Sequence, residues 1–122
     1  MRLRIARDVD AADLSQLTGA PAIRLAALHV VLAEDREGTA GVMALGPGGR
    51  LDPVWTAAGD RGRTAATALY DAIEAEARRG GLARLSTTAG SDLAAFLARR
   101  GWTETGEGAS GPEMERQMAP PA

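Results

Sequence analysis

Short runs in which polar and apolar residues alternate predict β-strands along the chain. In residues 2–7, Leu3 and Ile5 lie on one side and arginines on the other, which is the period of a half-buried strand. Two apolar runs, 29–33 and 39–45, predict an antiparallel hairpin. Further strands are predicted at residues 51–57, 82–87, 102–106 and 113–118.

The longest helical pattern covers residues 64–79. Its apolar residues recur every three or four positions and form one face, made of Ala65, Leu69, Ala72, Ile73 and Ala77. A second helix is predicted at 91–100, capped by Ser91 or Asp92, and a less periodic segment, 23–28, predicts another short helix.

One more short helix is predicted through Leu14 and Leu17. Asp10 or its neighbour Asp8 is its expected cap, and Gly19 stands where it would end.

Glycine, proline and charged residues separate these segments. Turns are predicted at 34–38, 46–49 and 108–112, and the proline-rich residues 119–122 are expected to be a frayed, flexible tail. No internal repeat or linker interrupts the rest. Residues 1–118 therefore predict a single domain of the α/β (α+β) class.

Composition narrows the class of protein. The 122 residues suffice for one core, and 45% hydrophobic with 25% charged residues is ordinary for a globular protein. The net charge is -2 and basic residues form no cluster, so neither nucleic acid nor an anionic membrane is expected as a partner. No stretch approaches 18 apolar residues and acids soon follow the first strand, so we expect a cytoplasmic protein.

Metal and thiol chemistry are not expected. The chain has no cysteine and one histidine, His29, which excludes a thiolate nucleophile and argues against a zinc centre or a histidine-based triad. His29 stands inside an apolar run, so we interpret it as a packing residue rather than a base, although its ordinary pKa would suit one.

The segment Arg61-Gly62-Arg63-Thr64-Ala65-Ala66 carries the first functional signal. It follows a predicted strand and opens the long helix, and unpaired N–H groups at a helix start attract anions. Small residues let a phosphate approach the backbone, while Arg61 and Arg63 add positive charge. An ordinary helix start beside arginines is the alternative.

The order of predicted elements resembles the GNAT superfamily of acyl-CoA-dependent N-acetyltransferases over essentially the whole chain. That family marks its pyrophosphate loop with Arg or Gln, two residues, Gly, one residue, then Gly or Ala. Arg61, Thr64 and Ala66 occupy these places. The segment from Ala95 to Trp102 also looks like the family's later aromatic and Gly-Phe signature.

The resemblance implies a mostly antiparallel, mixed central sheet of about six or seven strands, flanked by about four helices. It implies that the CoA pyrophosphate lies on the amides of residues 62–66, beside Arg61 and Arg63. It also implies that pantetheine pairs with the strand edge at Trp55, Thr56 and Ala57, where strands splay. Ser91 and Thr88 are candidates for hydrogen bonds to pantetheine, with a helix cap as the alternative for Ser91.

Asp52 is the predicted catalytic base, because similar enzymes often hold a carboxylate on this strand. An inert aspartate in a turn beside Pro53 is the alternative, and Glu34 and Asp35 are weaker candidates.

Three features depart from the family pattern. Thr64 replaces the first motif glycine, and Leu97 stands where many members have a tyrosine that protonates the leaving thiolate. The only tyrosine, Tyr70, is interpreted as a packing residue, as are both tryptophans. The segment 8–28 is compact, so the acceptor pocket is either open or completed by a second subunit.

These features predict an N-acetyltransferase that moves an acetyl group from acetyl-CoA, without a metal, to a primary amine of a small molecule or peptide by direct attack. A catalytically weak or inactive GNAT-like CoA-binding or protein-interaction module is the alternative, and a scaffold without CoA is a third reading. A homodimer is predicted, since dimers are common among similar proteins.

Overall fold

Seven strands, four α-helices and one 3-10 turn make up the described part of the fold. The computed structural model describes residues 1–108 and 111–118. The elements in chain order are β1 (Arg2–Ile5), a 3-10 turn (Asp8–Asp10), α1 (Ala11–Thr18), α2 (Ala22–Ala26), β2 (His29–Asp35), β3 (Gly38–Leu45), β4 (Leu51–Thr56), α3 (Gly59–Arg79), β5 (Arg84–Thr88), α4 (Ser91–Arg99), β6 (Thr103–Gly108) and β7 (Gly111–Gln117). Every predicted strand and helix is therefore present, with shifted ends. The tip of the predicted 108–112 turn, residues 109–110, and the predicted tail 119–122 lie outside the described residues.

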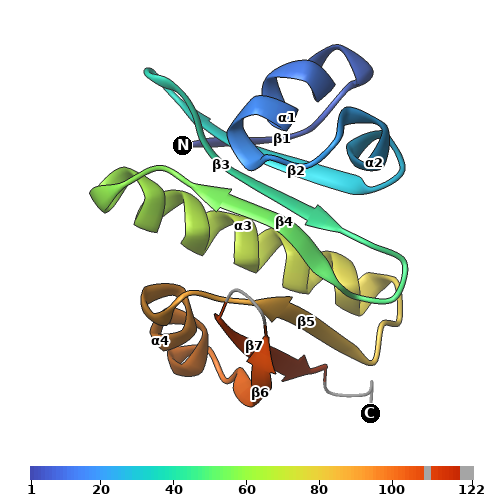
Figure 1. Ribbon diagram of the computed structural model, residues 1–122, viewed down its shortest axis with the longest axis vertical. Helices are drawn as coiled ribbons and strands as arrows, with labels where there is room; N and C mark the ends of the chain where they lie inside the picture. Colours follow the sequence, from blue (N-terminus) through green and yellow to red (C-terminus); the bar gives the residue numbers. More distant parts are fainter. Residues whose placement is uncertain (109–110, 119–122) are drawn as a thin grey trace.

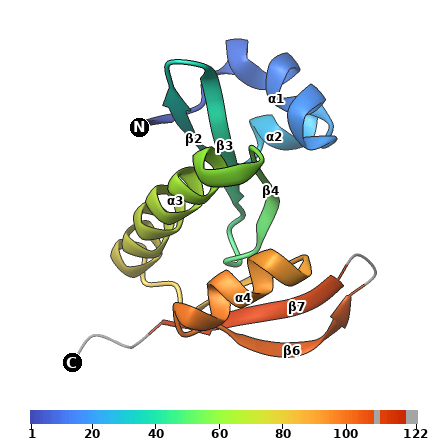
Figure 2. The ribbon, with the colours of Figure 1, turned by 90° about the vertical axis from the view of Figure 1, so that its left-hand side faces the viewer.

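The first four strands form an antiparallel sheet in the order β1-β2-β3-β4. Helices α1 and α2 cover one face and α3 covers the other (Figure 2). Because successive side chains of a strand point to opposite faces, the buried strands carry two apolar sets. Val30, Leu32, Val42 and Ala44 pack toward α1 and α2, and Val31, Ala33, Met43 and Leu45 belong to the cluster that contains the apolar face of α3.

The last three strands form a second antiparallel sheet in the order β5-β7-β6. Helix α4 lies on the face of this sheet that is turned toward α3 and β4 (Figure 2). Leu85, Leu97, Trp102 and Met114 are buried there and join the same core cluster as α3. The predicted strands are thus confirmed, and they are divided between two sheets.

The two sheets meet where β4 and β5 begin. Arg50 and Ser86 form a parallel bridge, and the Ser86 amide donates to the carbonyl of Gly49 at 3.0 Å. Gly49 has φ +87°, and a Cβ atom there would lie 2.2 Å from the carbonyl oxygen of Arg84, so the contact requires glycine.

Past this junction, Thr87 Oγ1 donates to the Leu51 carbonyl at 2.9 Å, and no further pair between the two strands forms within the described residues. The strands then separate toward the side on which α3 begins (Figure 1). The splay expected from the family resemblance is therefore present, and it leaves the edge of β4 without a strand partner.

The start of the long helix was predicted wrongly. Helix α3 begins at Gly59, after the extended residue Ala58, and not at Thr64. Gly59 takes φ +74°, a conformation that glycine adopts without cost, and Asp60 in the first turn suits the helix dipole. Gly62 therefore lies inside the helix and does not end a loop.

Two predicted caps also differ from the structure. Helix α4 is preceded by Gly90, so Ser91 is its first residue and neither Ser91 nor Asp92 is the cap. Asp10 does precede α1, but its carboxylate makes no capping bond, because it accepts hydrogen bonds from Arg4 and from the Arg7 amide.

Several predicted ends differ by a few residues. The β2–β3 hairpin reaches further than predicted, since β2 runs to Asp35 across a bulge at Ala33/Glu34 and β3 starts at Gly38. Strand β1 ends earlier, at Ile5, and β6 extends to Gly108.

Candidate functional site

A cavity of about 320 Å³ opens where β4 ends, α3 begins and α4 passes nearby. Its lining residues are Thr56, Ala57, Ala58, Gly59, Gly62, Arg63, Ala66, Asp92, Leu93, Phe96 and Arg99. Five of the residues predicted to bind the cofactor are among them: Thr56, Ala57, Gly62, Arg63 and Ala66. We call this space the α3 cavity.

The first turn of α3 supplies unpaired backbone donors to this region. Because the first four N–H groups of a helix lack partners within it, the free donors belong to Ala58 and the three residues that follow. The predicted donors, residues 62–66, lie deeper in the helix, where N–H groups bond to carbonyls of the preceding turn. The anion-attracting end of the helix is therefore about one turn earlier in the sequence than the motif indicated.

Gly62 has a structural reason to be glycine. A Cβ atom at this position would lie 1.7 Å from the carbonyl oxygen of Ala57 and 2.8 Å from its carbonyl carbon. The helix therefore approaches the end of β4 backbone to backbone. This contact sets the wall of the α3 cavity, because Ala57 and Gly62 both line it.

Arg61 is turned away from the α3 cavity. Its Nε and Nη2 atoms donate to the carboxylate of Asp35 at 2.7 and 2.9 Å, and Nη2 also reaches the carbonyls of Gly38 and Thr39. The predicted phosphate-binding arginine thus joins the start of α3 to the tip of the β2–β3 hairpin. The hydrogen bonds from Arg61 lower the pKa of Asp35 below its ordinary value.

We expect replacement of Arg61 with alanine to lower the melting temperature most at neutral pH. Asp35 has a lower pKa in the folded than in the unfolded chain, so its pairing stabilises the fold above the ordinary carboxyl pKa of about 4 and ceases to do so in acid. The difference between Arg61→Ala and wild type should therefore shrink between pH 7 and pH 3 in thermal melts. Arg63→Ala is the control, and a difference that does not depend on pH would contradict the pairing.

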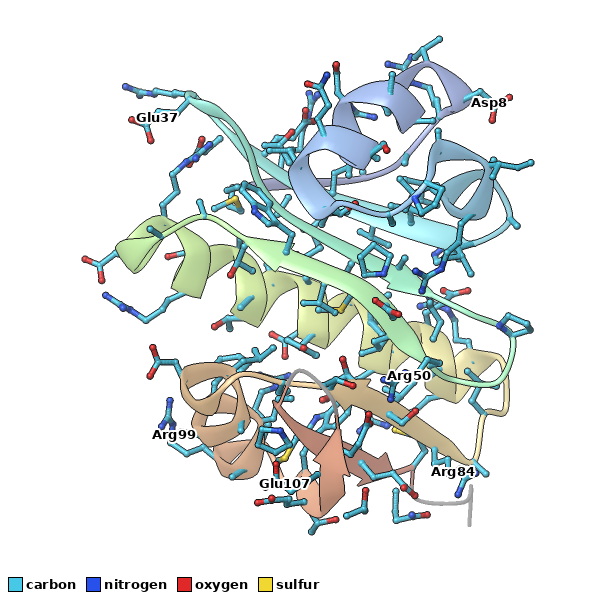
Figure 3. The ribbon with its side chains drawn as sticks, in the orientation of Figure 1. Asp8, Glu37, Arg50, Arg84, Arg99 and Glu107 are labelled. Atoms are coloured by element: carbon cyan, nitrogen blue, oxygen red, sulfur yellow. The ribbon has the colours of Figure 1, made fainter. Side chains whose placement is uncertain are left out.

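Arg63 and Arg99 are the basic residues that line the α3 cavity. Arg63 is exposed in the first turns of α3 and hydrogen-bonds to Asp60, and Arg99 ends α4. In Figure 3, Arg99 lies beside α4, on the side away from Arg50. Its neighbour Arg100 is mostly buried and pairs with Asp71 and Glu74.

Trp55, Thr64 and Ala65, which were also predicted to bind the cofactor, do not line the cavity. Trp55 packs against the cluster on the α1–α2 side of the sheet, as expected of a packing residue. Ala65 is fully buried, with its Cβ facing Gly41 of β3, and Thr64 is exposed on the outer side of the helix. Ser91 is the first residue of α4.

A second cavity, of about 340 Å³, adjoins the junction of the two sheets. It is lined by Thr18, Arg50, Leu51, Asp52, Pro53, Val54, Thr87, Thr88, Gly90 and Leu93. We call it the β4–β5 cavity. It contains Asp52, the predicted base, whose Oδ2 accepts a hydrogen bond from Arg24 Nη2 at 2.6 Å. About half of each of these side chains is exposed, so water has access to the carboxylate.

A hydrogen-bonded triad stands at the edge of the β4–β5 cavity. Arg50 donates to Glu113 (Nη1 to Oε2, 2.7 Å) and to Thr88 (Nη2 to Oγ1, 2.6 Å), and Thr88 donates to Glu113 Oε1 at 2.6 Å. The bonds from Arg50, and then from Thr88, lower the pKa of Glu113. Sequence reasoning singled out Thr88 alone, since nothing local signals that Arg50 and Glu113, 63 positions apart, would meet.

No tyrosine reaches either cavity. Leu97 is fully buried in the core, and Tyr70 is also fully buried, 5.7 Å from Phe96 and 5.8 Å from Trp102 between ring centroids. Burial raises the pKa of Tyr70, which opposes its ionisation. Tyr70 and Trp102 are therefore the packing residues that the sequence predicted.

The weaker candidate bases lie elsewhere and have other partners. Glu34 accepts a hydrogen bond from Arg4 at 2.7 Å, and Asp35 is held by Arg61. His29 begins β2 and lines a shallow groove between β1 and α3. None of the three lines the α3 or the β4–β5 cavity. Asp52 and Glu113 are the carboxylates at the β4–β5 cavity, and Asp92 lines the α3 cavity.

Within residues 1–108 and 111–118, no group of three or more potential ligands is placed to hold a metal ion. The helices of these same ranges include none that is both long and apolar enough to cross a membrane.

Comparison of the sequence with family models and with curated proteins finds no match. Solved structures, in contrast, match over almost the whole chain. A GCN5-related N-acetyltransferase from Rhodopseudomonas palustris is 21% identical with a TM-score of 0.77, covering 95% of this chain and 94% of that one. A Mycobacterium tuberculosis protein solved in complex with CoA is 17% identical with a TM-score of 0.80, covering 98% and 100%. The aminoglycoside 6'-N-acetyltransferase from Enterococcus faecium is 16% identical with a TM-score of 0.75, covering 100% and 99%.

These similarities show the fold. The chain has the GNAT fold that the order of its elements and its two short motifs indicated.

Proposed function

We propose that this protein is an N-acetyltransferase that moves an acetyl group from acetyl-CoA to a primary amine. The observation that carries the proposal is the separation of β4 from β5 directly beside the N-terminus of α3. The two cavities therefore adjoin one another. The unpaired edge of β4 and the free N–H groups of α3 lie beside them. Structural neighbours whose names include acetyltransferase activity or bound CoA support the same function.

The α3 cavity suits the CoA end of the substrate. Free N–H groups at the start of α3, together with Arg63 and Arg99, fit an anionic pyrophosphate. The edge of β4 near Thr56 and Ala57 offers backbone groups to the amides of pantetheine, as an added strand would use them. Arg61 is not in this set, because Asp35 holds it.

The β4–β5 cavity suits the amine. An amine must lose its ammonium proton before it attacks the thioester carbonyl, and Asp52, which lines this cavity, would accept that proton through water. The nitrogen–carbon bond then forms and the carbon–sulfur bond breaks. The second proton, which the nitrogen loses on becoming an amide, passes through water to the leaving CoA thiolate, since no tyrosine is nearby. Backbone N–H groups of β4 would polarise the carbonyl.

The acceptor is proposed to be a primary amine of a small molecule or a peptide. Some of the structural neighbours are aminoglycoside acetyltransferases. The predicted homodimer and cytoplasmic location stay predictions.

Calorimetric titration of the purified protein with acetyl-CoA, CoA and ADP tests the cofactor site. We expect saturable binding of acetyl-CoA with a dissociation constant of the order of micromolar. Screening of amines for release of the CoA thiol then tests transfer. Failure of acetyl-CoA to bind at millimolar concentration would contradict the proposal.

We expect alanine at both Arg63 and Arg99 to weaken CoA binding about tenfold or more, since charge-assisted hydrogen bonds to phosphate are lost. The control is alanine at both Arg36 and Arg78, which are exposed and do not line the α3 cavity. The two double variants change the net charge equally. If the two double variants bind CoA with equal affinity, Arg63 and Arg99 do not contact the pyrophosphate.

A CoA-binding module without transferase activity is the second candidate. The burial of both Leu97 and Tyr70 favours it, because no tyrosine proton donor can stand beside the leaving thiolate. Acetyl-CoA binding without turnover toward any amine would support this alternative.

A further inference from the structure

The first turn of α4 separates the two cavities. Gly90 lines the β4–β5 cavity, Asp92 lines the α3 cavity, and Leu93 lines both. Among the residues whose side chains the structure describes, no other is common to the two linings. The side chain of Leu93 is half-buried and packs against the core cluster to which both α3 and α4 contribute.

Strand β4 forms the wall opposite α4, and its residues also pass from the lining of one cavity to the lining of the other. Val54 lines the β4–β5 cavity and Thr56, two residues further, lines the α3 cavity. Two residues of a strand span about 7 Å. The boundary between the two cavities therefore has Val54 and Thr56 on the β4 side and Leu93 on the α4 side.

We propose that Leu93 limits the length of the acyl chain that the protein accepts. This inference rests on the proposed function, in which the pantetheine arm enters from the α3 cavity and the amine from the β4–β5 cavity. The thioester would then lie at the boundary between the cavities. The apolar side chains of Leu93 and Val54 there suit the methyl of an acetyl group and leave a longer chain without room beside Asp52.

Replacement of Leu93 by alanine removes most of the side chain that the two linings share, which widens the boundary between the cavities. The boundary gains room for an acyl chain, while Asp52, Arg63 and Arg99 stay unchanged. In an apolar pocket, room for one additional methylene changes the preference between two ligands by about tenfold or more. Leu93→Ala removes three carbon atoms. The affinity for a longer acyl-CoA should therefore rise relative to that for acetyl-CoA.

The experiment measures the binding of CoA, acetyl-CoA and hexanoyl-CoA by calorimetry, which needs no acceptor. Wild type should bind acetyl-CoA more tightly than hexanoyl-CoA, and Leu93→Ala should shift the ratio of the two dissociation constants about tenfold toward hexanoyl-CoA. Leu82→Ala is the matched control, because Leu82 is half-buried against the same core cluster but lines neither cavity. Leu93→Val should shift the ratio less and in the same direction, and it replaces Leu93→Ala if that variant unfolds.

The outcomes separate this inference from the function on which it rests. CoA binding with an unchanged ratio in the Leu93 variants would overturn the role of Leu93 and leave the acetyltransferase intact. Equal shifts in the Leu93 and Leu82 variants would also overturn it, since general loosening would then be the cause. Absence of binding of all three ligands to wild type would overturn both.

Discussion

Replacement of Asp52 by asparagine is expected to lower turnover about a hundredfold or more at neutral pH, with little change in the affinity for CoA. Asparagine keeps the shape of the side chain but cannot accept the proton of the attacking amine. Asp52 lines the β4–β5 cavity and not the α3 cavity, so the proposed CoA contacts stay intact. Steady-state kinetics with the best amine, together with calorimetry of CoA, separate the two effects.

The test of Asp52 needs a matched aspartate that lies outside both cavities. Asp13→Asn is the control, since Asp13 is exposed on α1 and lines neither cavity. Wild-type turnover by Asp52→Asn would remove this residue from the mechanism and leave Glu113 as the nearby carboxylate to test.

Much of the fold could be predicted because its strands and longest helix carry their own periodicity. On the predicted apolar face of α3, Leu69 and Ile73 are fully buried as expected, whereas Ala72 is only half-buried. The helix start could not be predicted in the same way. Gly62 resembles a loop residue in the sequence, and only the close contact with Ala57 explains a glycine inside the helix.

The candidate site was predictable where its residues are local. Thr56 and Ala57 at the end of β4 and Ala66 in α3 line one cavity because a short connection joins the strand to the helix. Contacts between segments far apart were not predictable. The motif assigned Arg61 to phosphate, but the hairpin tip lies beside the start of α3, and Asp35, 26 residues earlier, takes the guanidinium instead.

The gap between the two sheets also depends on contacts between segments that are far apart in the sequence. Sequence reasoning expected splayed strands only through the family resemblance. The triad at the junction depends on β7 returning beside β5, which places Glu113 opposite Thr88. Arg50, directly before β4, meets both. Such meetings of distant segments are set by the topology and leave no local trace in the sequence.

We expect Gly62→Ala to destabilise the fold and to weaken CoA binding more than tenfold, although alanine is normally the better helix residue. In a permissive site, Gly→Ala stabilises a helix by about 0.4–1 kcal/mol. Here the new Cβ would lie 1.7 Å from the Ala57 carbonyl oxygen, so backbone must move. Overpacking of this kind costs about 1–3 kcal/mol, which exceeds the gain.

The movement caused by Gly62→Ala would separate the start of α3 from the end of β4. Both segments line the α3 cavity, so the free N–H groups and the strand edge would no longer face one CoA molecule. Gly48→Ala is the matched control, since a Cβ there meets no atom within 4 Å and its φ is not positive. Thermal melts and CoA calorimetry measure the two effects. A Gly62→Ala protein with wild-type stability and affinity would show that the close contact with Ala57 is not what shapes the cavity.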